Sequence, residues 1–447
     1  MAVTYVGMRQ ITALILLLCS CAQAGATGFF IESQTPRTLG AATASAITGG
    51  TGESASADAS MAFWNPAALR NVGGNEIVTT LMLLLPDKAL ERNSSAIATA
   101  GTLGNFVPTG GDADGPRNAT EAVAGLYATW HTGEHWHFGV AVNSPFGLAS
   151  KYDQGWPGRY DSTVSRLITV DVAPSVSYDF DQFSIGGGIN IQYAKATLSS
   201  ALPDPFLSTP GAAADGHFEL QGDDTSIGFN LGAVWAPSTN LQLGIHYRSA
   251  MKHRLDGQRT IRDLNGPLAA ANGVATGAVN FNLPEILSLG VSYSSGPMTM
   301  SARWSGFNWS RLDELQVDYE SGLPADHFRF DYRDAYSAAI GLEYHPQRFP
   351  WLRPRVGIGY ATSMRRAPTI DSSLPDADHY FVGGGFSLDL NSGLTADIGW
   401  IHVEYNAARI HRTVVPYSAN PLLASVHSDL EFDTSADILA VGVAWHF

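Results

Sequence analysis

The side chains best suited to chemistry in this chain of 447 residues are three clustered histidines, His131, His135 and His137. Imidazole nitrogen is a common zinc ligand, and residues two apart on a strand share one face. However, the three histidines flank a short turn beside Trp136, a setting typical of a membrane interface. We therefore interpret them as interfacial residues and expect neither a metal nor a cofactor.

Other candidate chemical motifs are weaker. Gly49-Gly50-Thr51-Gly52 lacks the following lysine of a phosphate loop. An outer-membrane lipase or acyltransferase would need a serine, a histidine and a third group to converge, which the sequence alone leaves open. The formal charge of −15 argues against a nucleic-acid partner, because binding of nucleic acid needs a basic face. We expect a protein that is not an enzyme.

The first 24 residues have the features of a signal peptide. An apolar run over Ile11–Ala22 is too short to span a bilayer, and small residues suit cleavage after Ala24, with Ala26 as a second choice. Both cysteines fall inside this stretch; a lipobox ending at Cys21 is the alternative. The sequence thus predicts an exported protein.

Alternating hydrophobicity predicts an all-β membrane protein. No apolar run reaches eighteen residues, but apolar and polar positions alternate over 183–193, 225–235, 241–247 and 287–293. A soluble sandwich would show the same period. Two features favour a barrel: Gly, Ser, Asn and Arg on the polar faces suit a wet lumen, and aromatic residues stand near strand ends as in interfacial girdles. These aromatic residues are Tyr178, Trp235, Tyr247, Trp304, Tyr344 and Trp400.

The last segment, Asp437–Phe447, is the most specific signal. Its alternate positions form one apolar face that ends on Phe447. This segment resembles the closing strand of bacterial outer-membrane proteins, which the assembly machinery recognises. We therefore expect a protein of the bacterial outer membrane, in contact with its lipid and lipopolysaccharide.

Patterning predicts about fourteen strands, an even number as hairpin closure requires. They cover roughly 75–86, 120–131, 135–144, 164–180, 182–196, 222–236, 239–254, 276–294, 297–311, 327–345, 352–362, 377–390, 392–407 and 430–447. Long connections over 87–119, 145–163, 197–221, 255–275, 312–326, 363–376 and 408–429 would face outward. A barrel this wide leaves a channel or needs a plug.

The stretch before the first strand is the candidate plug. Residues 25–74 form this region, ahead of a barrel over 75–447. They are rich in Gly, Ala, Ser and Thr, with apolar pairs at Phe29 and Phe30 and at Phe63 and Trp64. Asn65-Pro66 is a turn signal, because Asn caps its own backbone and Pro fixes φ.

Several motifs together resemble the FadL family of outer-membrane transporters for hydrophobic compounds. They are Phe63-Trp64-Asn65-Pro66-Ala67, Asn143-Ser144-Pro145-Phe146-Gly147-Leu148, Trp156-Pro157-Gly158-Arg159-Tyr160, Asp331-Tyr332-Arg333-Asp334 and Leu374-Pro375-Asp376-Ala377-Asp378. The resemblance spans the mature chain in order. It implies a fourteen-stranded barrel with an N-terminal hatch, and release of substrate through a gap at a kinked third strand.

Such a transporter needs an apolar path, because moving a hydrocarbon into water costs about 0.8 kcal/mol per CH₂. Phe146, Leu148 and Trp156 are candidates for an outer groove, and the four aromatic residues of the hatch are candidates for an inner pocket. Plain packing of the hatch is the alternative for each. Asn65, Pro66 and Ala67 would gate the hatch, and Gly139 would kink the third strand; a glycine that only makes room for the hatch is the alternative.

The resemblance also implies two headgroup ligands, Arg159 and Arg333, since a guanidinium binds a carboxylate through two hydrogen bonds. The alternative for both is a structural charge paired with Asp161 or Asp334. The sequence does not decide among fatty acids, alkanes, aromatic hydrocarbons and sterol-like molecules. A general diffusion porin is the other function considered, and it would form trimers; the transporter reading predicts a monomer.

Overall fold

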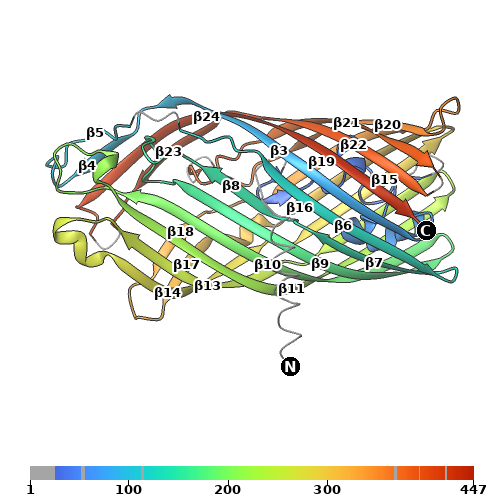
Figure 1. Ribbon diagram of the computed structural model, residues 1–447, viewed down its shortest axis with the longest axis horizontal. Coiled ribbons are helices and arrows are strands. Elements are labelled where there is room, and N and C mark those ends of the chain that lie inside the picture. Colours follow the sequence, from blue (N-terminus) through green and yellow to red (C-terminus); the bar gives the residue numbers. More distant parts are fainter. Residues whose placement is uncertain (1–25, 52–55, 112–114, 367–369, 392, 418–419) are drawn as a thin grey trace.

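The strands of the computed structural model close into an antiparallel barrel (Figure 1). The structure describes residues 26–51, 56–111, 115–366, 370–391, 393–417 and 420–447, so the predicted signal peptide over 1–24 lies outside it. The wall has fourteen strands, as predicted. Across the described ranges, no helix is long and apolar enough to cross a membrane.

Several wall strands consist of two segments separated by a bulge or short break. In chain order the barrel elements are β3 (Glu76–Asn93), β4 (Ala96–Thr99), β5 (Val107–Pro108), β6 (Glu121–Thr132), β7 (Trp136–Asn143), β8 (Gly147–Lys151), β9 (Val164–Phe180), β10 (Phe183–Leu202), β11 (Gly216–Ser238), β12 (Leu241–Arg248), β13 (Met251–Arg262), β14 (Gly273–Leu283), β15 (Ile286–Ser295), β16 (Met298–Phe307), β17 (Glu314–Tyr319), β18 (Asp326–Arg329), β19 (Ala335–Tyr344), β20 (Leu352–Ala361), β21 (His379–Asn391), β22 (Leu394–Tyr405), β23 (Ala408–Val414) and β24 (Ala424–His446). Short 3₁₀ helices η3 (Ala212–Ala214), η4 (Gly266–Ala271) and η5 (Trp309–Arg311) lie between strands. The ring closes where β24 pairs with β3.

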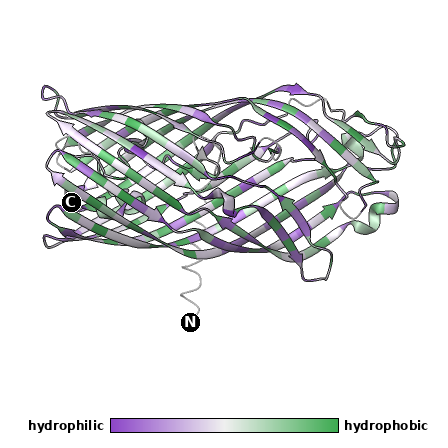
Figure 2. Cartoon of the chain, turned by 180° about the vertical axis from the view of Figure 1, so that it is seen from behind, coloured by the Kyte–Doolittle hydropathy of each residue, from purple (hydrophilic) through white to green (hydrophobic). Residues whose placement is uncertain are grey.

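The two faces of the wall differ as a membrane barrel requires. On β10 and β11, Ile189, Ile227 and Leu231 point outward and are 54%, 71% and 55% exposed. Between them, Asn190 and Asn230 point inward, are buried, and share a hydrogen bond of 2.9 Å. Figure 2 shows hydrophobic positions spread over the wall. An apolar outer face and a polar inner face confirm the barrel over the sandwich.

Strands extend further than the sequence predicts. β10 runs to Leu202, β11 begins at Gly216, β13 ends at Arg262, and part of the expected 408–429 connection is strand. In these extensions some outward positions are charged, as at Asp256, which is exposed. Hydrophobic alternation therefore stops where the lipid stops, while the hydrogen-bonded ladder continues above it.

The N-terminal segment, defined here as residues 28–72, is almost entirely buried where it is described. It contains β2 (Phe30–Ile31), α2 (Pro36–Gly40), α3 (Met61–Trp64) and η2 (Pro66–Asn71); β2 pairs with β1 (Ala26–Thr27). α2 contacts β20, β21, β22 and β24, whereas η2 contacts β7, β9, β10 and β11. Since these strands lie on different sides of the ring, the segment lies within it.

Glycines in the wall make room for the N-terminal segment. A Cβ at Gly383 would lie 2.6 Å from the Leu39 carbonyl oxygen, and one at Gly244 would lie 2.9 Å from the Ile47 oxygen. Both distances are shorter than van der Waals contact. The many glycines of the sequence are thus explained in part by close approach of two backbones.

Candidate transport site

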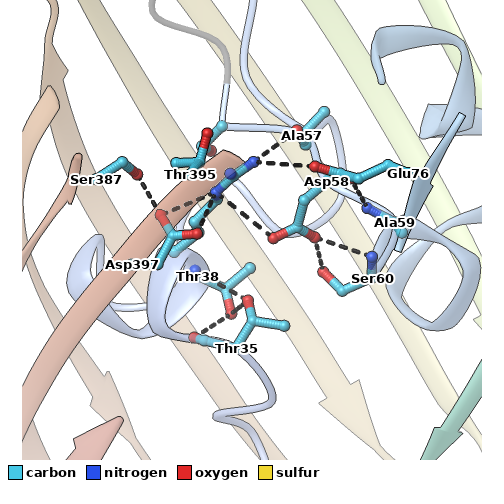
Figure 3. Close-up of polar contacts among 12 residues, drawn as sticks. Thr35, Thr38, Ala57, Asp58, Ala59, Ser60, Glu76, Ser387, Thr395 and Asp397 are labelled. Atoms are coloured by element: carbon cyan, nitrogen blue, oxygen red, sulfur yellow. Dashed lines mark hydrogen bonds and ion pairs between the residues drawn. The ribbon is translucent and has the colours of Figure 1, made fainter. Parts of the chain in front are cut away.

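Arg37 holds the N-terminal segment to the barrel wall. From α2, its Nε lies 3.0 Å from both carboxylate oxygens of Asp397 on β22. Asp58 and Glu76 add oxygens at 3.8 and 3.9 Å. Figure 3 shows Asp58, Glu76 and Asp397 converging on this point, with Ser387 donating to Asp397. All of the charged side chains are buried, so each depends on the others for compensation.

Two further buried contacts join the segment to β16 and β19 of the wall. Glu32 pairs with Arg303 on β16, and Ser337 donates to the same carboxylate at 3.0 Å. Ser56 donates to Glu343 on β19 at 2.8 Å. Together with the Arg37 cluster, these contacts fix the segment at several points around the ring.

Asn65 connects α3 to η2 and fits against the wall. Its Oδ1 accepts from the Ala67 backbone N–H at 3.2 Å, which caps η2 with Pro66 at the first helical position. Its Nδ2 donates to the Ile47 oxygen at 2.8 Å. A Cβ at Gly232 would overlap the Asn65 amide. The predicted turn at Asn65-Pro66 is present and is buried.

The third wall strand breaks between β7 and β8. Asn143 pairs with Asp171 of β9, and Gly147 pairs with Ile168 of β9. Three residues lie between Asn143 and Gly147, but only two lie between their partners on β9, so the third strand has one extra residue. The extra residue is a bulge, which bends the strand and exchanges its inward and outward positions. Pro145 lies in this bulge, where it has no amide hydrogen to lose from the ladder.

The bulge pairs with the N-terminal segment instead of with β6. The Ile31 N–H donates to the Pro145 oxygen at 2.9 Å, and the Gly147 N–H donates to the Phe29 oxygen at 2.8 Å. The Phe30 and Phe146 rings lie 5.4 Å apart. β6 pairs with β7 only from Leu126 onward, so residues 121–125 pair with β3 alone. The wall therefore has an unpaired edge here.

The kink was predicted at the wrong residue. Gly139 lies in regular pairing, opposite Thr129 on one side and Ser175 on the other. A Cβ there would lie 2.7 Å from the Ala62 Cβ of α3. Gly139 thus makes room for the N-terminal segment, and the bend lies at residues 144–146.

An apolar cavity opens inside the barrel next to the bulge, with about 860 Å³ of empty space, part of it continuous with solvent. Its lining includes Phe29, Leu148, Leu255, Phe281, Leu315, Phe328 and Tyr332. Gly222, Gly257 and Gly277, which are neighbours on β11, β13 and β14, give one side of it no side chains. Phe29 and Leu148, both predicted substrate contacts, therefore share one cavity.

The other predicted aromatic residues lie elsewhere. Phe30 and Phe146 pack at the bulge, beside the cavity. Phe63 and Trp64 border a smaller space of about 270 Å³ lined also by charged residues, and the Arg248 guanidinium lies 4.3 Å from the Phe63 ring. Trp156 stacks on Tyr152 at 4.1 Å, is buried against Phe432, and does not line the apolar cavity.

Arg159 is occupied by internal partners. Its Nε lies 2.6 Å from the Asp215 carboxylate, and its terminal nitrogens donate to Tyr160 and to the Thr109 and Gly110 carbonyls. The side chain is fully buried. The partner proposed from sequence, Asp161, pairs instead with Arg412 at 3.4 Å.

Arg333 is partly exposed. It lies 3.6 Å from Asp378, where Asp334 was the expected partner, and it donates to the Ser363 oxygen at 2.9 Å. It does not line the apolar cavity. The structure thus does not bring Arg159 and Arg333 together as a clamp on that cavity.

The histidines form no metal centre. The His131 and His137 rings lie 4.4 Å apart, His137 faces Asp179 at 3.1 Å, and His135 sits over Tyr178. Within the described ranges no group of three or more His, Cys, Asp or Glu residues could hold a metal ion.

Comparison with known proteins decides the family. A family model described as "Outer membrane protein transport protein (OMPP1/FadL/TodX)" matches residues 17–447. The chain belongs to this family. It is 24% identical over 480 residues to a putative outer membrane protein of Neisseria meningitidis, covering 98% of this chain and 99% of that one. It is 23% identical over 312 residues to the long-chain fatty acid transport protein of Escherichia coli K12, covering 61% and 68%.

Solved structures support the fold of this FadL-family barrel. A FadL homologue of Pseudomonas aeruginosa superposes with a TM-score of 0.80 at 20% identity, over 94% of this chain and all of that one. The toluene transporter TodX of Pseudomonas putida gives 0.66 at 17%, with the same coverage. The chain is thus an outer-membrane β-barrel, as its sequence predicts.

Sequence reasoning missed most of the cavity. Phe281 lies on a strand whose inward face was expected to be polar, whereas Leu255 and Leu315 lie in stretches that were expected to be outer connections, 255–275 and 312–326. Arg37 and Asp58, which anchor the N-terminal segment, are far from Asp397 in the chain, so no local pattern shows that the three side chains meet. A charged residue at an inward strand position, such as Asp397, was the available clue.

Proposed function

We propose that this protein carries hydrophobic small molecules, fatty acids or hydrocarbons, across the outer membrane. The observation that carries the proposal is an apolar cavity inside the barrel beside a bulged, incompletely paired wall strand. Relatives described as long-chain fatty acid and toluene transporters agree with this class of cargo. A water-filled porin would not need an apolar chamber, because ions and sugars gain nothing from one.

In the proposed route the cargo enters the cavity from the outer loops and leaves sideways at the bulge. The free edge of β6 at residues 121–125 borders the opening. On the outer face an apolar groove extends across β22, β24, β3 and β6 as far as Asn143 at the end of β7. Leu81, Leu126 and Val441 line it. Lateral release into lipid would spare the cargo the cost of crossing water.

The N-terminal segment is proposed to act as the hatch of this route. It separates the cavity from the opposite end of the barrel, and it supplies the two backbone hydrogen bonds that satisfy the bulge. Phe29 lines the cavity while Phe30 touches Phe146. Movement of these neighbouring residues would couple the cavity to the opening.

Removal of the bulge tests the lateral route. Deleting Pro145 leaves the same number of residues between Asn143 and Gly147 as their β9 partners have, so β7 and β8 can pair as one strand. We expect the deletion variant to assemble, to retain binding of a hydrophobic cargo, and to lose uptake. Replacement of Pro145 by Ala keeps the residue count and serves as the matched control. Wild-type uptake by an assembled deletion variant would refute lateral exit.

A further inference from the structure

The apolar cavity contains one buried polar group without a partner. Tyr332 lines the cavity and is 3% exposed. Its hydroxyl has no hydrogen-bond partner among the described residues. Its ring is fixed by Phe330 at 5.1 Å and by Phe29 at 6.3 Å. An unsatisfied buried hydroxyl is unfavourable, so a ligand that forms a hydrogen bond with it is bound more tightly.

The surroundings of Tyr332 do not favour an anion. The charged side chains near Tyr332 are Arg365, Asp371 and Asp376. Arg412 pairs in turn with Asp371 and with Asp161. Arg365 lies 4.8 Å from the Tyr332 ring but forms a two-fold ion pair with Asp371 at 2.8 and 3.1 Å. Because Arg365 is engaged by Asp371, it offers no free positive charge to a ligand carboxylate.

Tyr332 itself stays neutral. Burial raises the pKa of its hydroxyl above the usual value, despite the nearby Arg365 guanidinium. The group therefore offers one O–H donor and acceptor lone pairs at physiological pH. A neutral oxygen can accept this hydrogen bond without the large cost of burying an ionised carboxylate that has no cation.

One cation lines the cavity, Arg166 on β9. It is exposed, whereas the next residue, Leu167, is buried and faces the cavity. Because neighbours on a strand point to opposite faces, Arg166 directs its side chain away from the chamber that Leu167 borders.

We infer that the cavity selects an uncharged amphiphile, an apolar body with one neutral hydrogen-bonding oxygen, which Tyr332 anchors. This inference rests on the proposed function and specifies, within the class of hydrophobic small molecules, alcohols, ketones or esters of that build in place of ionised fatty acids and plain hydrocarbons. Tyr332 acts as a specificity-determining residue, and the surrounding aromatic and aliphatic side chains hold the apolar body.

The test compares three probes of equal length, dodecane, dodecan-1-ol and dodecanoate, at pH 8. The mature protein is reconstituted in lipid nanodiscs, each probe displaces radiolabelled dodecan-1-ol, and empty nanodiscs give the background. We expect dodecan-1-ol to bind more tightly than either other probe. Tyr332→Phe should weaken binding of the alcohol by roughly 3- to 10-fold, the loss of one neutral hydrogen bond, and leave dodecane unchanged. Tyr247→Phe is the matched control, since that hydroxyl bonds to Glu285 and does not line the cavity.

The outcomes distinguish failure of the Tyr332 inference from failure of the proposed transport function. Binding of dodecanoate as tight as that of the alcohol would overturn the inference, and its selective loss in Arg166→Gln would assign the headgroup to Arg166. An unchanged alcohol affinity in Tyr332→Phe would also overturn it, while dodecane binding would leave the proposed function standing. Failure of all three probes to bind would count against the proposed function itself.

Discussion

Replacement of Arg37 by Ala should release the N-terminal segment from the wall while the barrel still assembles. Arg37 faces the buried carboxylates of Asp58, Glu76 and Asp397. Without it, the cation left beside Asp397 among the described residues is Arg355 at 3.8 Å, and Glu76 keeps His446 at 3.2 Å.

The size of the effect follows from the burial of this cluster. Removal of one partner of a buried ion pair costs about 3–5 kcal/mol, because the remaining charges stay desolvated. At about 1.36 kcal/mol per tenfold change, the docked segment would become roughly 10² to 10⁴ times less favoured relative to undocked forms. Protonation of a carboxylate would offset part of that loss, so we expect the lower end.

Hydrogen exchange over residues 28–72 and single-channel conductance in planar bilayers measure this change. Arg37→Ala should lower amide protection by the factor above and give conductance events that the wild type lacks. Asp397→Asn combined with Arg37→Met, which removes one charge of each sign, should restore part of the protection. Exchange and conductance identical to wild type in Arg37→Ala would refute the view that this cluster holds the segment.

Changes at the Asn65 turn and at Gly139, and the conductance of the wild-type protein, each have a distinct expected result. Asn65→Ala, alone or with Pro66→Ala, removes the η2 cap, which should cost about 1 kcal/mol and alter uptake in an assembled barrel. Gly232→Ala should give the same phenotype, because its Cβ would overlap the Asn65 amide. Normal transport by all three variants would exclude a role for this turn. Gly139→Val should displace Ala62 and raise hydrogen exchange in α3 without closing the wall. Loss of uptake with unchanged exchange in α3 would support the original prediction that Gly139 forms the kink. The wild-type protein should conduct ions poorly in planar bilayers because the N-terminal segment fills the lumen, and a large steady conductance would favour the porin reading.

The wall was predictable because each strand carries its own alternation of apolar and polar residues. Alternation over 183–193 and 225–235 reflects lipid on one side and polar lumen on the other, so strand number, order and core boundaries follow from the sequence. The strand extensions at Leu202 and Arg262 were missed, since above the lipid the ladder no longer needs an apolar face.

The interior was much less predictable. Leu148 and Trp156 were expected in an outer groove and Phe29 in an inner pocket. Phe29 and Leu148 instead line one cavity, and Trp156 packs against Phe432. Arg159 was expected to bind a headgroup or to pair with Asp161, and only the fold brings Asp215 to it. The bulge at Pro145 requires knowledge of the β9 register, which no local pattern contains.

The seam between β3 and β24 sets the order in which this molecule can form. It joins residues 76–93 to 430–446, the two ends of the wall in sequence. The N-terminal segment leads directly into β3, yet its Arg37 and Pro36 contact β22 and β24. We expect these contacts to hold the first strand close to its final partner during assembly, as a tether raises effective concentration. Loss of these contacts should slow barrel biogenesis even in a variant whose finished form is sound.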